Sequence, residues 1–244
     1  MSDLDAAVRD LLRASAVPAT ADRVAELVDA LLEGLPGPVD PVGPGPIMAI
    51  SRWSTNGHLI ADCAKLGYLQ AGGRTLDPTF GLGTFWSVWR PDELVAHDLD
   101  PAKSPTGKSV DATDLPYPDR SFHNVVLDGP YKLNGTPSAG IDERYGVHET
   151  THWRERLDLL GLMLVEGARV LGDGYLLYKC QDQVCCGKVR WQTTIFTNLA
   201  AELGLGLVDR FDFLSYRAQP NGTRQVTARR NYSTLLVFKR GWRS

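Results

Sequence analysis

Apolar residues in the first 33 positions recur at intervals of three and four, which is the spacing of an amphipathic helix. This spacing predicts two helices, separated near Pro18. The next stretch, 34–46, reads GLPGPVDPVGPGP, and nine of its 13 positions are glycine or proline. That density excludes a helix or a central strand. The sequence therefore predicts an N-terminal helical segment over 1–33, a linker over 34–46 and a main domain over 47–244.

After the linker, segments with helical spacing alternate with short apolar runs typical of buried strands. The predicted helices are 58–69, 157–171 and 193–203. The predicted strands are 75–77, 94–98, 124–128, 174–178, 207–214 and 233–239. Strands that alternate with helices predict an α/β fold with a doubly wound, mainly parallel sheet. No helix separates the last two strands, so we expect them to form an antiparallel pair at one edge.

The overall composition is that of an ordinary globular protein, with 43% hydrophobic and 23% charged residues. No apolar run reaches 18 residues, so the sequence predicts no membrane-spanning helix. The start of the chain lacks the basic region and apolar core of a signal peptide. Four cysteines among 244 residues do not make a disulfide scaffold. We therefore expect a cytoplasmic protein.

The net charge of −3 conceals an uneven distribution. Residues 1–186 carry 16 basic and 26 acidic side chains, whereas 187–244 carry 10 basic and three acidic ones. An excess of basic residues at one end of a chain is typical of contact with a polyanion. We therefore expect a nucleic acid as the partner.

The segment 216–232 is the most basic part of that end and has a tyrosine at each terminus. Its arginines are Arg217, Arg224, Arg229 and Arg230. Arginine contacts phosphates, and aromatic rings stack on unpaired bases. This segment is the candidate nucleic-acid contact, and a solvated surface is the alternative. Further residues that could extend the same surface are Lys179, Lys188, Arg190 and Trp191.

A glycine-rich turn follows the first predicted strand of the main domain, in the sequence DPTFGLGT over 77–84. Glycine lets the backbone pass close to a ligand, and a helix after the turn would offer free N–H groups. A lone Gly-x-Gly is weak evidence for a ligand, because most such matches are structural turns. This one lacks the Gly-Lys-Ser/Thr of a phosphate loop and the third glycine of the dinucleotide fingerprint. The turn therefore points to a ligand only in combination with other residues.

Acidic residues supply that combination. Asp98 ends the second strand of the domain, Asp111 follows 13 residues later, and Asp128 ends the third strand in the sequence DGPY. Ligands of open α/β sheets bind at the carboxyl ends of the strands. Asp98 could accept both hydroxyls of a ribose, and Asp111 an adenine amino group. Each aspartate alone is typical of a turn or a helix cap, but these three together with Asp77 favour one site.

These motifs resemble those of class I S-adenosylmethionine-dependent methyltransferases, and among them the amino-methyltransferases that act on exocyclic nitrogens of nucleic-acid bases. The resemblance covers roughly residues 50–240 and rests on DPTFGLGT, the acid in AHDLD, DATDLPYPDRSFHNVVLD and DGPY. It implies a Rossmann-like sheet of seven strands with an antiparallel last strand. It also implies S-adenosylmethionine as the cofactor, bound by Asp77, Pro78, Phe80, Gly81, Gly83, Asp98, Asp111 and Ala112.

The tetrapeptide Asp128, Gly129, Pro130 and Tyr131 matches the Asp/Asn/Ser-Pro-Pro-Tyr/Phe motif of that family's catalytic loop, with Gly129 in place of the first proline. Glycine loosens the loop but keeps the backbone carbonyl. An exocyclic base nitrogen is a poor nucleophile because its lone pair is delocalised into the ring. If Asp128 and a backbone carbonyl accept its two N–H bonds, the lone pair turns toward the sulfonium methyl, while Tyr131 stacks on the flipped base. A plain turn is the alternative.

The predicted function is methyl transfer to an exocyclic amino group of a DNA base, adenine N6 or cytosine N4. One alternative is an RNA base methyltransferase, for instance one that modifies guanine N2 in transfer RNA. The other is a nucleic-acid-binding protein that keeps the cofactor fold without turnover. About 45 residues separate the glycine motif from the tetrapeptide, so target-reading elements must lie elsewhere. The segment 51–54 could complete the cofactor pocket or serve as a capping loop.

Three cysteines, Cys180, Cys185 and Cys186, together with His148 and His152, raise the question of zinc. The spacing C-x4-C-C has no second well-spaced pair, as structural zinc sites require. We therefore expect no metal.

Overall fold

The computed structural model describes residues 46–133, 152–215, 227–228 and 230–242. Except for Pro46, these residues belong to one compact unit, Ile47–Ser244. The helices predicted over 1–33 lie outside the described residues, as do all of the predicted linker but Pro46, and Arg217, Arg224 and Arg229. The predicted domain boundaries therefore stay a prediction.

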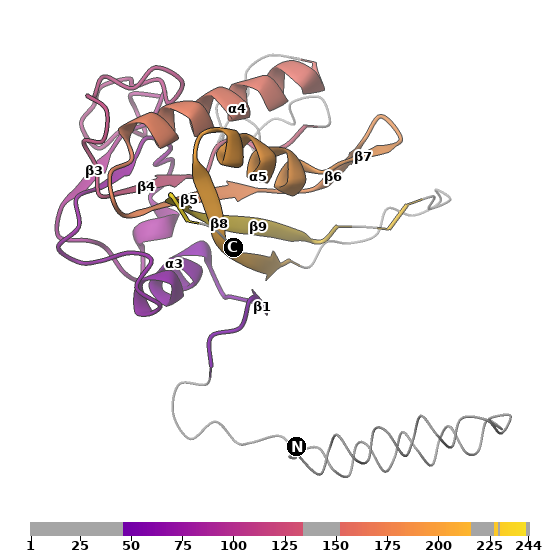
Figure 1. Ribbon diagram of the computed structural model, residues 1–244, viewed down its shortest axis with the longest axis horizontal. Helices are drawn as coiled ribbons and strands as arrows, with labels where there is room; N and C mark the ends of the chain where they lie inside the picture. The colour runs from indigo at the N-terminus through magenta and orange to yellow at the C-terminus, as the bar shows by residue number, and fades with distance from the viewer. Residues whose placement is uncertain (1–45, 134–151, 216–226, 229, 243–244) are drawn as a thin grey trace, which may run out of the picture. The chain divides into compact units, whose positions relative to one another are not determined.

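A seven-stranded sheet lies at the centre of this unit (Figure 1). Across the sheet the strands are β1 (Ile50–Ser51), β8 (Leu205–Leu214), β9 (Tyr232–Arg240), β5 (Tyr175–Cys180), β4 (Asn124–Leu127), β2 (Thr75–Asp77) and β3 (Leu94–Ala96). Neighbours run parallel except at β9, which is antiparallel to β5 and β8. The predicted fold class is confirmed. The pair β8 and β9 does not form the outermost edge, because β1 pairs with β8.

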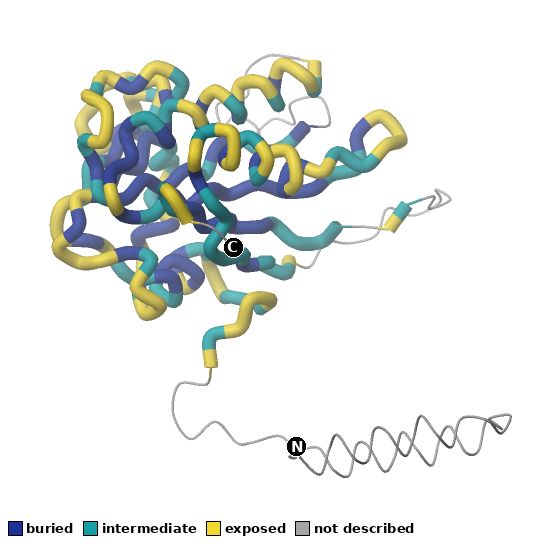
Figure 2. Tube along the Cα trace, in the orientation of Figure 1, coloured by how far each residue is buried: buried dark blue, intermediate teal, exposed yellow. Residues whose placement is uncertain are grey.

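Helices cover both faces of the sheet (Figure 1). The helices are α3 (Asn56–Lys65), α4 (Trp153–Val170), α5 (Gln192–Glu202) and the 3₁₀ turn η1 (Thr84–Trp86). One apolar cluster lies between the sheet and α4 and α5, and the other between the sheet and α3 with η1. Figure 2 shows the central strands as buried, between helices whose outer sides are exposed. No helix in the described part of the chain is both long and apolar enough to cross a bilayer.

The alternation of side chains along the strands decides which residues meet at each face. Successive side chains in a strand point to opposite faces. In β4, Val125 packs in the cluster under α4, and Val126 packs in the cluster around α3. In β5, Tyr178 belongs to the α4 side and Leu177 to the α3 side. By the same alternation, Lys179 faces α3.

The order of the strands marks one place where a ligand is expected. From β2 the chain moves outward to β3 and then returns to the other side of β2 as β4. In open α/β sheets, ligands bind at the carboxyl ends of the strands where the order reverses in this way. Asp77 ends β2, and Asp128 comes directly after β4. The topology therefore brings two of the predicted site residues to this position.

Three elements differ from the prediction, and one of them is β1, whose residues lie outside the predicted strands. The helix expected after the glycine turn is the three-residue η1, because the residues that follow include a valine, a second tryptophan and Pro91, all weak helix formers. A short hairpin of β6 (Gln183–Cys185) and β7 (Lys188–Arg190) was not predicted. Cys186 and Gly187 at its tip have φ values of 52° and 73°, as a two-residue turn between twisted strands requires.

Candidate active site

Asp77 is a buried carboxylate that shapes the glycine turn. Its Oδ1 accepts hydrogen bonds from the N–H and the hydroxyl of Thr79, at 2.9 and 3.1 Å, and its Oδ2 accepts one from the Trp86 indole at 2.7 Å. Pro78, between them, is buried. Burial raises the pKa of Asp77 to about 6, although these hydrogen bonds act in the opposite direction. Asp77 therefore anchors the glycine turn through its hydrogen bonds to Thr79 and Trp86.

The turn itself uses backbone conformations that favour glycine. Gly81 and Gly83 have φ values of 55° and 68°, in the left-handed region. A Cβ on Gly83 would lie 2.6 Å from the Phe80 ring. The N–H of Gly81 donates to Asp98 Oδ2 at 2.8 Å, and the N–H of Phe80 donates to the carbonyl of His97 at 2.9 Å. The structure thus places the predicted glycine turn and Asp98 in direct contact.

Asp98 also organises the loop that follows β3. Its Oδ1 accepts from the N–H of Asp100 at 2.9 Å. Each carboxylate oxygen can accept a second hydrogen bond, so the half-buried side chain keeps the capacity for ribose hydroxyls. The Asp98 carbonyl accepts from the N–H of Val110 at 3.0 Å. This bond brings the segment that carries Asp111 to the same edge of the sheet.

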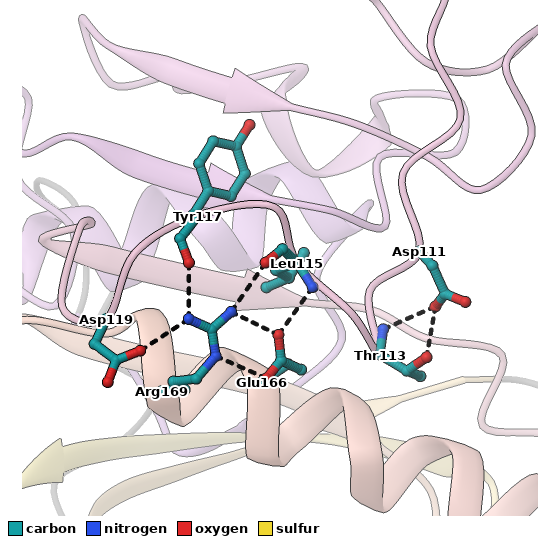
Figure 3. Close-up of polar contacts among 7 residues, drawn as sticks. All are labelled: Asp111, Thr113, Leu115, Tyr117, Asp119, Glu166 and Arg169. Atoms are coloured by element: carbon teal, nitrogen blue, oxygen red, sulfur yellow. Dashed lines mark hydrogen bonds and ion pairs between the residues drawn. The ribbon is translucent and has the colours of Figure 1, made fainter.

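Asp111 lies in a turn of the loop that follows β3, and Figure 3 shows its contacts with Thr113. Its Oδ1 accepts from the N–H and the hydroxyl of Thr113, at 2.8 and 2.7 Å. Asp111 is exposed and Ala112 is buried. The same hydrogen bonds occur in ordinary aspartate turns, so the adenine contact of Asp111 and Ala112 stays a prediction.

An ion-pair network holds the rest of this loop against α4 (Figure 3). Arg169 donates to the carbonyls of Leu115 and Tyr117, at 2.9 and 2.7 Å, and to the carboxylates of Asp119 and Glu166. Glu166 in turn accepts from the N–H of Leu115 at 2.8 Å, and the Arg169 guanidinium lowers its pKa. These bonds anchor the loop to α4.

Asp128 differs from the other aspartates. Its N–H donates to the Thr79 hydroxyl at 2.9 Å, so one threonine links the ends of β2 and β4. Its Oδ1 is buried and has no hydrogen-bond partner among the described residues. Burial raises the pKa of Asp128, and the positive charge of Lys179 opposes that effect. A buried acceptor without a partner is costly, and such groups concentrate at functional sites.

Lys179 is a site residue whose place the sequence-based interpretation got wrong. We expected it to extend a basic surface, but the structure buries it to 3% exposure. Its Nζ donates to Asn56 Oδ1 at 2.8 Å and lies 3.9 Å from Asp128 Oδ2. The rings of Phe85 and Tyr131 surround it, with centres at 5.1 and 5.8 Å. The signal in the sequence is a lysine within the otherwise uncharged strand YLLYKC.

Gly129 stands where α4 approaches the backbone. A Cβ at this position would lie 2.9 Å from Leu160 Cδ2 and 3.0 Å from Met163 Sδ. This close approach is a physical reason for glycine where the resembled motif has proline. The Gly129 carbonyl accepts from the N–H of Tyr131 at 2.7 Å. One of its two lone pairs remains for a further donor.

Two glutamines fix the end of the tetrapeptide. The Tyr131 carbonyl accepts from Gln183 Nε2 at 2.6 Å and from Gln192 Nε2 at 2.8 Å. Gln183 comes from β6, and Gln192 begins α5. Gln183 also accepts from the N–H of Leu133 at 3.1 Å. The unpredicted hairpin of β6 and β7 therefore supports the predicted loop of the tetrapeptide 128–131.

Arginines stack on tryptophans where the hairpin meets α4 and β9. Arg190 and Arg154 lie over the Trp153 ring, at 3.8 and 4.6 Å, and Arg230 lies over the Trp191 ring at 4.4 Å. We call these five residues the arginine–tryptophan cluster. Trp191 is 48% exposed. Of the four arginines predicted to contact nucleic acid, Arg230 is within the described residues, and that contact stays a prediction.

A groove of about 880 Å³ runs along α3, away from the glycine turn, and is lined in part by Arg52, Trp53 and Ser54. The Trp53 indole donates to Asp62 at 2.9 Å. The place of 51–54 in a cofactor pocket therefore stays a prediction. Within the described ranges, no three His, Cys, Asp or Glu side chains are grouped to hold a metal ion, and His148 lies outside these ranges.

No protein-family model and no curated protein matches this sequence. Solved structures do match. A chain from the complex between the Haloferax volcanii Trm112 methyltransferase activator and a suggested methyltransferase is 14% identical with a TM-score of 0.46, over 77% of this chain and 94% of that chain. The MccD protein is 14% identical with a TM-score of 0.47, over 75% of this chain and 96% of its own.

A third match is a suggested DNA modification methylase from Thermus thermophilus, solved with S-adenosyl-L-methionine. It is 19% identical with a TM-score of 0.34, over 53% of this chain and 50% of that chain. The matched region thus spans half the length of that methylase. At these identities and TM-scores, the matches do not assign an activity.

Proposed function

We propose that this protein transfers a methyl group from S-adenosylmethionine to an exocyclic amino group of a DNA base, adenine N6 or cytosine N4. The observation that carries the proposal is the state of Asp128. This carboxylate stands at the reversal point of the sheet, and one of its oxygens is buried without a partner among the described residues. A hydrogen-bond donor of a substrate would satisfy that oxygen.

The ends of β2 and β3 fit the cofactor. Among the described residues, a Cβ on Gly81 would meet only the Thr79 carbonyl, at 3.9 Å, so the backbone there leaves space that a ligand can enter. Asp98, beside Gly81, would accept the ribose hydroxyls, and Asp111 with Ala112 would contact the adenine. When bound, S-adenosylmethionine supplies an electrophilic methyl group on a sulfonium sulfur.

The ends of β4 and β5 fit the target amine. Asp128 would accept one N–H of the amino group, and the remaining lone pair of the Gly129 carbonyl would accept the other. These two bonds free the nitrogen lone pair for attack. Burial raises the pKa of Asp128, which makes it a better acceptor for the proton that the methylated nitrogen must lose. Positioning of the two reactants would supply much of the rate.

The polymer would be held by the arginine–tryptophan cluster together with the basic segment 216–232. Guanidinium groups contact phosphates, and an exposed ring such as Trp191 can stack on an unpaired base. A base must leave its helix to reach Asp128, and Tyr131 would stack on it there. We favour DNA over RNA because DGPY resembles the motif of the DNA amino-methyltransferases.

The test is methyl transfer by the full chain from methyl-labelled S-adenosylmethionine to unmethylated DNA and to transfer RNA. The products are digested to nucleosides and identified by mass spectrometry. We expect label in N6-methyladenine or N4-methylcytosine. Label in N2-methylguanosine instead would establish the RNA alternative. Cofactor binding without transfer to either polymer would favour a nucleic-acid-binding protein, and no cofactor binding would overturn the proposal.

The polymer contact has a separate test. Replacement of Arg229 and Arg230 by alanine should weaken DNA binding and reduce the slope of log affinity against log salt by about 2, since each phosphate contact contributes about 0.9. Arg120→Ala removes an exposed arginine that pairs with Asp173, and should leave the slope unchanged. A slope that does not change in the double variant would identify these arginines as a solvated surface.

A further inference from the structure

The pairing of β4 with β5 places a lysine beside the catalytic aspartate. Leu127 of β4 is in register with Tyr178 of β5 in a parallel pair, so the next residues, Asp128 and Lys179, come at the same level of the sheet. Both residues lie two positions beyond side chains of the α3 cluster, Val126 and Leu177. Strand alternation therefore directs both side chains to the same face.

The buried ammonium group of Lys179 has the Asp128 carboxylate as its charged partner. A buried ammonium group requires a partner, because its desolvation is costly. Asn56, at 2.8 Å, is a neutral acceptor and does not compensate the charge. The carboxylate that pairs with Lys179 is Asp128, with Nζ 3.9 Å from Oδ2. This distance is too long for a hydrogen bond, so Lys179 acts on Asp128 through its charge.

Charged groups on the neighbouring strands act on the ionisation of Asp128 in opposite directions. From β2, Asp77 brings a second buried carboxyl group, and the two like charges raise the cost of ionising both. From β5, Lys179 brings the opposing positive charge, while α3 contributes the neutral Asn56. Burial raises the pKa of Asp128 and Lys179 lowers it. Burial likewise lowers the pKa of Lys179, and Asp128 raises it.

We propose that Lys179 is a positioning residue for methyl transfer, whose charge keeps Asp128 ionised so that both carboxylate oxygens remain acceptors for the target amine. A protonated Asp128 would present a donor where the amine needs an acceptor. The inference rests on the proposed function for its role in transfer, but the effect of Lys179 on the ionisation of Asp128 does not depend on that function.

The test compares Lys179→Gln with the wild-type full chain. Glutamine lacks the charge but keeps an amide that can donate to Asn56. The titration of Asp128 is followed by carbon-13 NMR of labelled aspartate carboxyl groups, with the signal assigned from Asp128→Asn. We expect the midpoint to rise by at least about one pH unit, which is 1.4 kcal/mol for the ionised form. The acidic limb of kcat/KM should move by the same amount, and the rate should recover at high pH.

Two controls separate charge from structure. Lys65→Gln removes an exposed lysine of α3 that pairs with Asp62, and should leave the Asp128 titration unchanged. Where Lys179→Gln does not fold, Lys179→Met fills the same space without charge, and buried ion pairs often tolerate such replacement.

The outcomes distinguish this inference from the proposed function. An Asp128 midpoint that does not move, or a rate loss that is equal at every pH, would overturn the role of Lys179, whether or not the protein methylates DNA. A shifted midpoint in a protein that transfers no methyl group would uphold the effect of Lys179 on Asp128 and refute the proposed function.

Discussion

The two halves of the site differ in how completely their carboxylates are bonded. In what we propose as the cofactor half, at the ends of β2 and β3, both oxygens of Asp77 and both oxygens of Asp98 accept hydrogen bonds from the protein itself. In what we propose as the transfer half, at the ends of β4 and β5, Asp128 Oδ1 has no partner among the described residues. Its other oxygen faces Lys179 at 3.9 Å.

This difference separates two tasks. The proposed cofactor half is shaped by hydrogen bonds within the protein itself. In the proposed transfer half, Asp128 Oδ1 is a buried acceptor without a partner among the described residues, which lowers the stability of the fold. A hydrogen-bond donor of the substrate would offset that loss. A group-transfer site benefits from this difference, because the target amine alone then completes the hydrogen bonds of Asp128.

The strongest test of the comparison is removal of the reserved carboxylate. Asp128→Ala should lower methyl transfer by at least about 10³-fold, because the target amine loses its acceptor. Cofactor affinity should stay within about twofold, since the cofactor half does not depend on Asp128. Single-turnover transfer and calorimetry measure the two quantities. Asp173→Ala, at an exposed position, is the matched control. Wild-type turnover in Asp128→Ala would refute its catalytic assignment.

The opposite result is expected from the cofactor half. Asp98→Ala should weaken S-adenosylmethionine binding by about 10- to 100-fold, since hydrogen bonds to charged groups contribute about 1.5–3 kcal/mol. Transfer at saturating cofactor should change far less. Asp114→Ala, at an exposed position on the neighbouring loop, is the control. If Asp98→Ala instead reduced kcat at unchanged cofactor affinity, the division into two halves would be wrong.

A smaller effect should follow from pH. The pKa of Asp77 is raised to about 6, so the carboxyl gains a proton in the folded protein as pH falls from 7 to 5. Protonation turns one oxygen into a donor and releases either Thr79 or Trp86, which loosens the glycine turn. We expect cofactor affinity to fall by about three- to tenfold over this range. Asp77→Asn should remove most of the dependence, and a wild-type affinity that is constant from pH 5 to 8 would contradict the role of Asp77.

The smallest effect concerns packing behind the transfer half. Gly129→Ala should lower the free energy of unfolding by about 1 kcal/mol, because its Cβ would press on Leu160 and Met163, whose side chains can shift. A double-mutant cycle with Met163→Ala should show coupling, since the smaller side chain leaves room for the methyl group. Chemical denaturation measures both. Additive effects would mean that α4 does not restrict this position.

Residues that follow strands were predictable, because strand ends can be read from local patterns. Asp77, Asp98 and Asp128 end the predicted strands 75–77, 94–98 and 124–128, and the topology brings them to one edge. Lys179 could not be placed, because its role depends on β5 lying next to β4 in one register. The same holds for Asn56, which reaches the site from α3. The contribution of Gln183 depends on a hairpin whose Cys-Gly turn is a weak signal.

S-adenosylmethionine should bind at the glycine turn and not in the groove of about 880 Å³ along α3. A crystal structure of the full chain with S-adenosylmethionine tests it most directly. We expect density for the cofactor beside Gly81 and Asp98, with its methyl group on the side of Asp128. Density in the groove lined by Arg52 and Trp53, with the glycine turn empty, would rule out the proposed cofactor site.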